Sequence, residues 1–240
     1  MNVLDLFSGI GGFSLGLERA GMRTVAFCEI DAYNRDIIRR HWPDVPIYED
    51  VRTLKADQLG HVDVVCGGFP CQDISNSGKR MGIEGERSGL WREFARLIGE
   101  LRPRFAIVEN VAAINFRGLG RVLADLAALG YDAEWHVIPA WTLGAPHERE
   151  RCWIIAYPQG ESRLYQSNIG EAAARLLTDA PPWETCPWDS PAAAVCRMDD
   201  GIPDRVVDTE RLGNAVVPSI PEILGRALMM NRRPDDSRSA

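Results

Sequence analysis

A cysteine between a proline and a glutamine is the first residue of this sequence that could do chemistry. It is Cys71, in the stretch GGFPCQDISNSGK that covers residues 67–79. The preceding apolar run, HVDVVCGGF, predicts a buried strand, which puts Pro70 and Cys71 in the loop at its carboxyl end. Most free cysteines are small buried hydrophobic residues. A thiol in a loop at a sheet edge is instead a candidate nucleophile, because the thiolate is the reactive form.

A carboxyl group occupies the end of the next strand-like run. FAIVENV, residues 105–111, predicts a second buried strand and carries Glu109 near its end. Consecutive strands are usually neighbours in a sheet, so we expect Cys71 and Glu109 to face one cleft. A thiolate beside an acid indicates nucleophilic addition assisted by proton donation.

Two arginines precede the last strong strand-like run, in HERERCW at residues 147–153. Arg149 and Arg151 alternate, so in an extended chain both side chains point to one side. Their guanidinium groups could hold a phosphate or a carbonyl oxygen through forked hydrogen bonds. An exposed charge run is the alternative interpretation.

A glycine-rich turn near the N-terminus indicates a ligand site. DLFSGIGGF, residues 5–13, combines a strand, a turn and the start of a helix, although its spacing is not G-x-G-x-x-G and a purely structural turn is the alternative. Two later runs end on carboxylates, Glu29 and Asp50. In a doubly wound sheet an acid about 20 residues beyond the glycine turn commonly holds ribose hydroxyls. Since Asp50 could accept from an adenine amino group, the three features together favour an adenosine-type cofactor.

The elements that must position these residues alternate strands with amphipathic helices. Predicted strands cover residues 3–7, 24–30, 45–51, 62–69, 105–111, 133–140 and 151–157, and predicted helices cover 12–20, 31–42, 88–101 and 117–129. This rhythm predicts an α/β fold with a doubly wound, mostly parallel sheet covered on both faces. The predicted divisions are a catalytic domain at 1–157, a small irregular subdomain at 158–208 with one helix near 170–178, a C-terminal segment at 209–232 that returns to the catalytic domain, and a polar tail at 233–240.

Composition and charge set broad limits. The 240 residues are 45% hydrophobic and 25% charged, which is typical of a globular protein with a sizeable core. The formal net charge is -7, so a nucleic-acid partner would have to meet a local basic surface. The six cysteines lack the spacing of a zinc site or a disulfide framework, so we expect no metal. With no bilayer-length apolar stretch and no signal-peptide pattern, we expect a cytoplasmic protein without a membrane partner.

Together these blocks resemble the cytosine-5 DNA methyltransferases, of phage or restriction-modification type. They occur in the family's order: DLFSGIGGF, Glu29, EDV at 49–51, GGFPCQDIS, ENV at 109–111, R-x-R at 149–151 and GNAV at 213–216. The resemblance covers nearly the whole chain except residues 158–205 or so. It implies a Rossmann-like methyltransferase fold and methyl transfer from S-adenosylmethionine to carbon 5 of a cytosine flipped out of double-stranded DNA.

The resemblance also implies how the site would act. The Cys71 thiolate would add to carbon 6 of the cytosine, make carbon 5 nucleophilic, and leave by elimination after the transfer. Glu109 would hydrogen-bond the amino group and ring nitrogen 3, and burial would raise its pKa so that it can be protonated. Arg151 would face the cytosine carbonyl oxygen, and Arg149 would support the pocket or the catalytic loop.

Two sets of binding residues follow from the resemblance. The residues around the cofactor would be Phe7, Gly9, Gly11, Glu29, Ile30, Asp50, Val51, Pro70, Asn214 and Val216. Within this set, Ile30 and Val51 would sandwich the adenine ring. The residues near DNA would be Gln72, Ser77, Lys79 and Arg80, in a loop whose small residues allow it to close.

Two features depart from the family pattern. His147 stands where glutamine is common, which leaves the role of this position open. The segment 158–208 is short for a target-recognition domain, and the bases that flank the target cytosine cannot be inferred from it. Trp183 and Trp188 in this segment could stack on bases or only cover a small subdomain.

Alternatives to this interpretation stay open. A branch of the same family methylates tRNA, although the loop QDISNSGK favours DNA. A catalytically silent module that binds S-adenosylmethionine or nucleic acid and needs a partner is an alternative of a different class. We expect a monomer, because base-flipping enzymes can act alone. Whether a cognate restriction endonuclease is a partner stays open.

Overall fold

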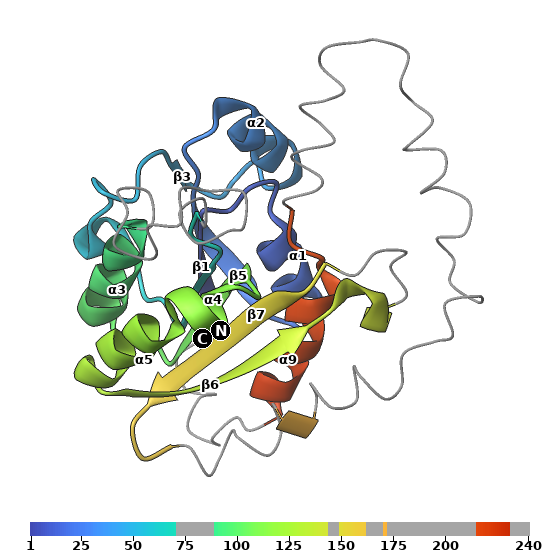
Figure 1. Cartoon of the computed structure of the whole chain (residues 1–240). Coiled ribbons are helices and arrows are strands. Elements are labelled where there is room, and N and C mark those ends of the chain that lie inside the picture. Colours follow the sequence, from blue (N-terminus) through green and yellow to red (C-terminus); the bar gives the residue numbers. More distant parts are fainter. Residues whose placement is uncertain (71–88, 144–148, 162–169, 172–214, 231–240) are drawn as a thin grey trace.

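The computed structural model describes residues 1–70, 89–143, 149–161, 170–171 and 215–230 (Figure 1). Strands in these ranges form one seven-stranded sheet in the order β3-β2-β1-β4-β5-β7-β6. Their bounds are β1 Asn2–Leu6, β2 Arg23–Cys28, β3 Ile47–Tyr48, β4 Val64–Gly67, β5 Phe105–Val111, β6 Tyr131–Ile138 and β7 Arg151–Pro158. Strands β1 to β5 are parallel, and β7 is antiparallel to both β5 and β6.

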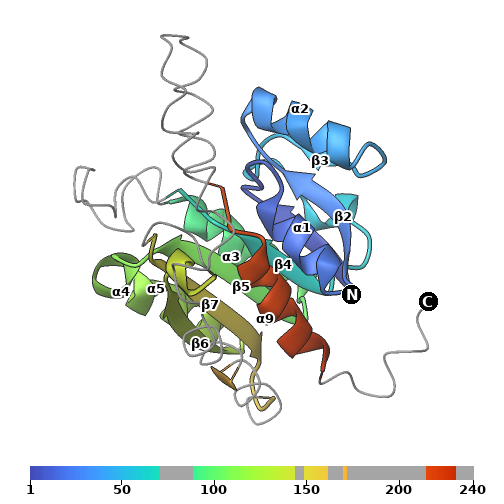
Figure 2. The ribbon, with the colours of Figure 1, turned by 90° about the vertical axis from the view of Figure 1, so that its right-hand side faces the viewer.

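Helices cover both faces of this sheet, as Figures 1 and 2 show from two sides. Their bounds are α1 Gly12–Arg19, α2 Ala32–His41, α3 Leu90–Leu101, α4 Ile114–Arg117, α5 Leu119–Ala128 and α9 Ser219–Met229, with short 3₁₀ turns η1 Ala56–Gln58 and η3 Ala140–Leu143. Strand side chains alternate between two apolar clusters, one under α3 and α5 and the other under α1 and α9. The sheet is therefore buried on both faces, which explains why its strands are nearly continuous apolar runs.

Helix α3 illustrates how the sequence produces this packing. Trp91, Phe94, Leu97 and Ile98 recur at helical spacing and are all almost fully buried. Their cluster includes strand residues such as Val65 from the centre of the sheet. This packing fixes α3 against the sheet, directly after the chain segment that contains Cys71.

The predicted fold class is confirmed, a mostly parallel sheet between helical layers. Two of the predicted elements differ most clearly from the structure. The strand predicted at 45–51 is limited to β3, because the backbone turns at Asp50, whose carbonyl accepts the amides of Thr53 and Leu54. The helix predicted at 117–129 begins earlier and divides into α4 and α5 at Gly118.

The C-terminal segment contains the described helix α9. Helix α9 begins at Ser219 with Pro218 at the N-cap position, and it packs against α1 through the same apolar cluster. Residues 215–230 therefore lie against the N-terminal part of the chain. Apart from residues 170–171, the helix predicted near 170–178 lies outside the described residues.

Candidate active site

Among the residues that the structure describes, Glu29, Asp50 and Glu109 lie at or just beyond the carboxyl ends of strands β2, β3 and β5. Strands β1, β2, β4 and β5 are parallel, so their carboxyl ends lie at one edge of the sheet. Strand β7 runs in the opposite direction, so its first residue, Arg151, lies at the edge where β5 ends. The antiparallel direction of β7 therefore places Arg151, at the start of that strand, beside the loops that follow the parallel strands.

Arg151 and Glu109 form an ion pair at this edge, with Nε of the arginine 3.0 Å from Oε1 of the glutamate. Arg151 pairs with Val111, two residues beyond Glu109, so both side chains lie on the same face of the two strands. Glu109 is only 9% exposed. Burial raises the pKa of its carboxyl group, whereas the charges of Arg151 and Arg149 oppose that rise.

Glu109 also lies against the backbone that leads to Cys71. A Cβ atom on Gly68 would be 2.8 Å from Oε2 of Glu109, so a larger residue here would require the Glu109 carboxylate to shift. The neighbouring Asn110 donates from Nδ2 to the carbonyl of Phe69 at 3.1 Å. The chain is thus held in place just before Pro70, which directly precedes the predicted nucleophile.

Asn110 is a site residue that is missing from the sequence-based set. It is buried, and its Oδ1 accepts the amide of Val111 at 2.9 Å while its Nδ2 holds Phe69. The sequence signal that could have identified Asn110 is a side-chain amide at the end of an apolar run. Such an amide is buried, and a buried amide needs hydrogen-bond partners.

The C-terminal segment joins Arg149 to the glycine turn. Nη2 of Arg149 donates to the carbonyl of Ala215 at 2.6 Å. A Cβ atom on Gly12 would overlap the carbonyl oxygen of Val216, so these two backbones pass in direct contact. Burial lowers the pKa of Arg149, and repulsion by the charge of Arg151 lowers it further. The described part of GNAV therefore lies between the R-x-R sequence and the turn after β1.

The Glu29 carboxylate holds the glycine turn through a hydrogen bond. Its Oε2 accepts the amide of Gly9 at 2.7 Å, and its Oε1 accepts the amide of Asp31 at 2.8 Å. Glu29 is 7% exposed, and burial raises the pKa of its carboxyl group while these two amides lower it. A carboxylate offers about four lone-pair sites, so a ribose hydroxyl would share Glu29 with the backbone rather than displace it.

Asp50 and Ile30 lie at matching positions, each two residues beyond the paired residues Cys28 and Tyr48. Both oxygens of Asp50 accept hydrogen bonds from the Arg52 guanidinium at 2.7 to 3.0 Å, which lowers the pKa of the aspartate. Ile30 is 67% exposed. An exposed apolar side chain and a carboxylate thus follow the ends of two neighbouring strands.

Val51 and Phe7 differ in how much of their side chains is exposed at this side of the site. Val51 is 4% exposed and belongs to the core cluster, so it offers little surface to a ligand in this structure. Phe7 is half-buried and has a φ of 53°, a costly conformation for a residue other than glycine. Its ring stacks on Phe94 of α3 with centroids 6.4 Å apart. Apolar surface from Phe7 and Ile30 next to two carboxylates fits an adenosine group.

Several predicted residues lie outside the described residues: Cys71, Gln72, Ser77, Lys79, Arg80, His147, Trp183, Trp188 and Asn214. Their roles stay predictions. In the part of the chain that the structure describes, no group of three or more His, Cys, Asp or Glu residues is arranged to hold a metal ion. Within those same ranges no helix has the length and apolar character needed to cross a membrane.

Known proteins match the same stretch of sequence. The family model described as C-5 cytosine-specific DNA methylase matches residues 1–179. The Type II methyltransferase M2.BsuMI of Bacillus subtilis is 35% identical over 164 residues, which are 65% of this chain and 42% of that protein. The Type II methyltransferase M.Eco47II of Escherichia coli is 38% identical over 161 residues, 64% of this chain and 39% of that protein.

A solved structure agrees with these matches in fold. The crystal structure of a DNA modification methyltransferase encoded within a prophage (E. coli) is 28% identical and has a TM-score of 0.57, over 69% of this chain and 50% of that chain. This chain thus spans half or less of the length of these relatives. Since the family model covers most of the sequence, the chain belongs to the family of C-5 cytosine-specific DNA methylases.

Proposed function

We propose that this chain is a DNA (cytosine-5-)-methyltransferase of the restriction-modification type that acts on a cytosine flipped out of double-stranded DNA. The observation that carries the proposal is the Glu109–Arg151 pair, held against Gly68 on the strand end that leads to Cys71. A carboxyl group next to a guanidinium group complements the edge of cytosine, which presents an amino group, ring nitrogen 3 and a carbonyl oxygen. Extrusion of the base costs a few kcal/mol and gives these groups access to it.

The proposed reaction begins at Cys71. Its thiolate forms a bond to carbon 6 of the cytosine, and the electron pair of the 5,6 double bond moves to carbon 5, which becomes nucleophilic. After carbon 5 has gained a methyl group, a base removes the proton on that carbon. The electrons of the broken carbon–hydrogen bond restore the double bond, and the bond from sulfur to carbon 6 breaks to release the thiolate.

Glu109 would hold the proton that this addition needs. Burial raises the pKa of its carboxyl group, so the protonated form persists to a higher pH than for an exposed glutamate. The protonated carboxyl can donate to ring nitrogen 3, where charge builds up, while its other oxygen accepts from the amino group. Arg151 would donate to the carbonyl oxygen, and Arg149, bonded to the carbonyl of Ala215, would keep this pocket in shape.

The cofactor site would lie at the ends of β1, β2 and β3. Members of this family use S-adenosylmethionine, which when bound supplies the methyl group for carbon 5. In this chain Glu29 would orient the ribose, Asp50 would accept from the adenine amino group, and Ile30 would cover the adenine ring. Phe7, supported by Phe94, would limit the site next to the glycine turn. No metal ion is part of the proposal.

The proposal also divides the chain by role. Residues 1–157 would form the catalytic domain, and 158–208 would be a short target-recognition segment. Residues 209–232 would return to the catalytic domain, which the contacts of Ala215 with Arg149 and of Val216 with Gly12 support. The enzyme would act as a monomer, and a cognate endonuclease would be a partner in a restriction-modification system.

Mapping of 5-methylcytosine tests this function in cells. The chain and a Cys71→Ala variant would be expressed in a host that lacks cytosine methylation, and the host DNA would be analysed by bisulfite sequencing. We expect methylation in one short sequence context with the wild type and none with the variant. Soluble wild-type protein in cells with unmethylated DNA would contradict the proposal. Methyl transfer to tRNA alone would show that the substrate is tRNA and not DNA.

A further inference from the structure

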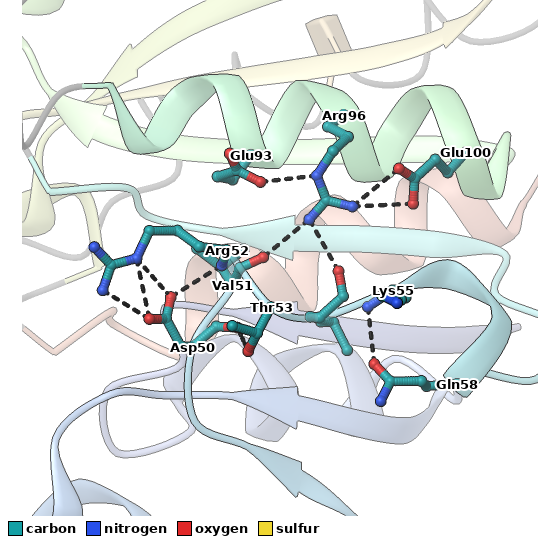
Figure 3. Close-up of polar contacts among 10 residues, drawn as sticks. Asp50, Val51, Arg52, Thr53, Lys55, Gln58, Glu93, Arg96 and Glu100 are labelled. Atoms are coloured by element: carbon teal, nitrogen blue, oxygen red, sulfur yellow. Dashed lines mark hydrogen bonds and ion pairs between the residues drawn. The ribbon is translucent and has the colours of Figure 1, made fainter.

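Arg96 on α3 has hydrogen-bond acceptors around all three of its nitrogen atoms (Figure 3). Its Nε donates to Oε2 of Glu93 at 2.8 Å, and its Nη1 lies 3.0 Å from both carboxylate oxygens of Glu100. Its Nη2 donates to two backbone carbonyls, that of Val51 at 3.0 Å and that of Leu54 at 2.9 Å. The two glutamates lie one helical turn to either side of Arg96, so they orient the guanidinium group toward residues 50–54.

The acceptors of Nη2 belong to a single turn of backbone. The amides of Thr53 and Leu54 both donate to the carbonyl of Asp50, which closes the turn. The Nη2 group of Arg96 carries two N–H donors, and it satisfies the carbonyls of Val51 and Leu54 at once. The backbone of residues 50–54 is thereby tied to α3.

This turn begins with Asp50, which the proposed function assigns to the adenine amino group. Ile30, which would cover the adenine ring, follows the adjoining strand β2. Helix α3 also supports Phe7, since Phe94 stacks on the Phe7 ring. One rigid helix thus supports two sides of the proposed cofactor site.

We propose that Arg96 is a positioning residue for the adenine end of the cofactor site. It would act by holding the main chain of Asp50 and Val51 at a fixed distance from α3, so that the Asp50 carboxylate is preorganised to accept from the adenine amino group. This inference rests on the cofactor site of the proposed function. Arg96 would act on the backbone of Asp50 and not on its charge, because the Asp50 carboxylate is paired with Arg52.

A role in stability alone predicts a different pattern. Ion pairs of partly exposed side chains such as Arg96 with Glu93 or Glu100 contribute little to stability. The bonds to Val51 and Leu54 are different, because they join segments 45 and 42 residues apart in the sequence. Their loss would free the turn locally and change how well the site selects its ligand.

Binding of S-adenosylhomocysteine to the full chain, measured by calorimetry, tests this role. A second probe is the analogue in which hydrogen replaces the adenine amino group, since it removes the donor to Asp50. The variants are Arg96→Ala and Arg96→Lys, and the control is Arg226→Ala, which breaks a one-turn ion pair with Glu222 on α9. Thermal melting of each variant verifies that it is folded.

We expect Arg96→Ala to weaken binding of S-adenosylhomocysteine roughly tenfold, the loss typical of charge-assisted hydrogen bonds, and to reduce the preference over the analogue. Arg96→Lys keeps one point charge without the fork, so it should fall between the wild type and the alanine variant. Arg226→Ala should bind like the wild type. In methylation assays the KM for S-adenosylmethionine should rise while kcat at saturation stays near the wild-type value.

Three results would overturn the inference, and the third is distinguishable from the first two. Unchanged binding by Arg96→Ala, or equal weakening toward both probes, would show that Arg96 does not position Asp50. A folded wild-type chain that binds neither probe would instead contradict the cofactor site of the proposed function, and this role with it. If Arg96→Ala does not fold, the same comparison is made with Arg96→Lys.

Discussion

Arg151 and Glu109 lie on neighbouring antiparallel strands with Nε and Oε1 3.0 Å apart. The pair is diagonal across β5 and β7, and both side chains are on the same face of the sheet. Burial raises the pKa of the carboxyl group at the same place where the guanidinium opposes that rise. The site therefore holds a carboxyl group that can be protonated next to a fixed cation, which is what protonation of a cytosine ring and recognition of its carbonyl oxygen require.

Glu109→Gln removes the proton donor while keeping the shape of the side chain. We expect kcat to fall by about 10² to 10⁴, the usual contribution of a general acid, because the amide cannot protonate ring nitrogen 3. The rate of transfer of a tritiated methyl group to DNA measures the effect. A variant that keeps more than about half of the wild-type kcat would show that proton donation by Glu109 is not needed.

Arg149→Gln should change the pH dependence of the reaction. The positive charge of Arg149 lowers the pKa of Glu109, so its removal lets that pKa rise. If the protonated form of Glu109 is active, activity is lost as the pH rises through this pKa, and in the variant the loss should begin at a higher pH. The profile of kcat/KM against pH for variant and wild type measures the shift. A shift to lower pH would contradict this assignment.

The sequence predicts the chemistry of the site better than its supporting contacts. The apolar runs and the carboxylates at their ends place Glu29, Asp50 and Glu109 at one sheet edge, because parallel strands share that edge. An apolar run does not reveal the direction of its strand, so the sequence could not predict the antiparallel β7 or the register that brings Arg151 to this edge. The short length of β3 is also not evident from its apolar run, because a local turn at Asp50 follows the strand.

The residues missing from the predicted set act through long-range contacts. Asn110 holds the carbonyl of Phe69, and Arg96 holds the carbonyls of Val51 and Leu54. Such acceptors are backbone atoms, which carry no sequence signal of their own. A side chain that bonds the backbone of a distant segment therefore becomes visible only when the strands and helices are placed.

Gly12→Ala tests the contact between the glycine turn and the C-terminal segment. The new Cβ atom would overlap the carbonyl oxygen of Val216, so the segment must shift, at a cost of about 1–3 kcal/mol in the free energy of unfolding. Gly120→Ala in α5 is the matched control, because a Cβ atom there would meet nothing within 4 Å. It should stabilise the protein by roughly 0.5–1 kcal/mol through helix propensity.

Urea denaturation measures both glycine variants. Opposite signs for Gly12→Ala and Gly120→Ala are the expected outcome. If both variants gained stability, the described contact between Gly12 and Val216 would not be tight in solution.

Asp5→Asn should change how stability depends on pH. Asp5 is fully buried, with Ser14 donating to Oδ2 from both its amide and its hydroxyl, and burial raises the pKa of the aspartate to about 8. A folded-state pKa above the unfolded value means that stability is present at low pH and is lost as the pH rises through the folded pKa. Between pH 5 and 8 the melting temperature of the wild type should fall relative to that of the variant. A difference between the two proteins that stays constant across this range would contradict a titrating Asp5.

The most direct test of the central claim is a covalent trap. The chain and S-adenosylmethionine would be incubated with duplex DNA in which every cytosine is 5-fluorocytosine, because fluorine at carbon 5 cannot leave as a proton and blocks elimination. We predict a stable protein–DNA adduct of the summed mass, formed only with S-adenosylmethionine present and absent for Cys71→Ala. Methyl transfer to ordinary DNA without any adduct from the fluorinated duplex would contradict attack by Cys71 on the cytosine ring.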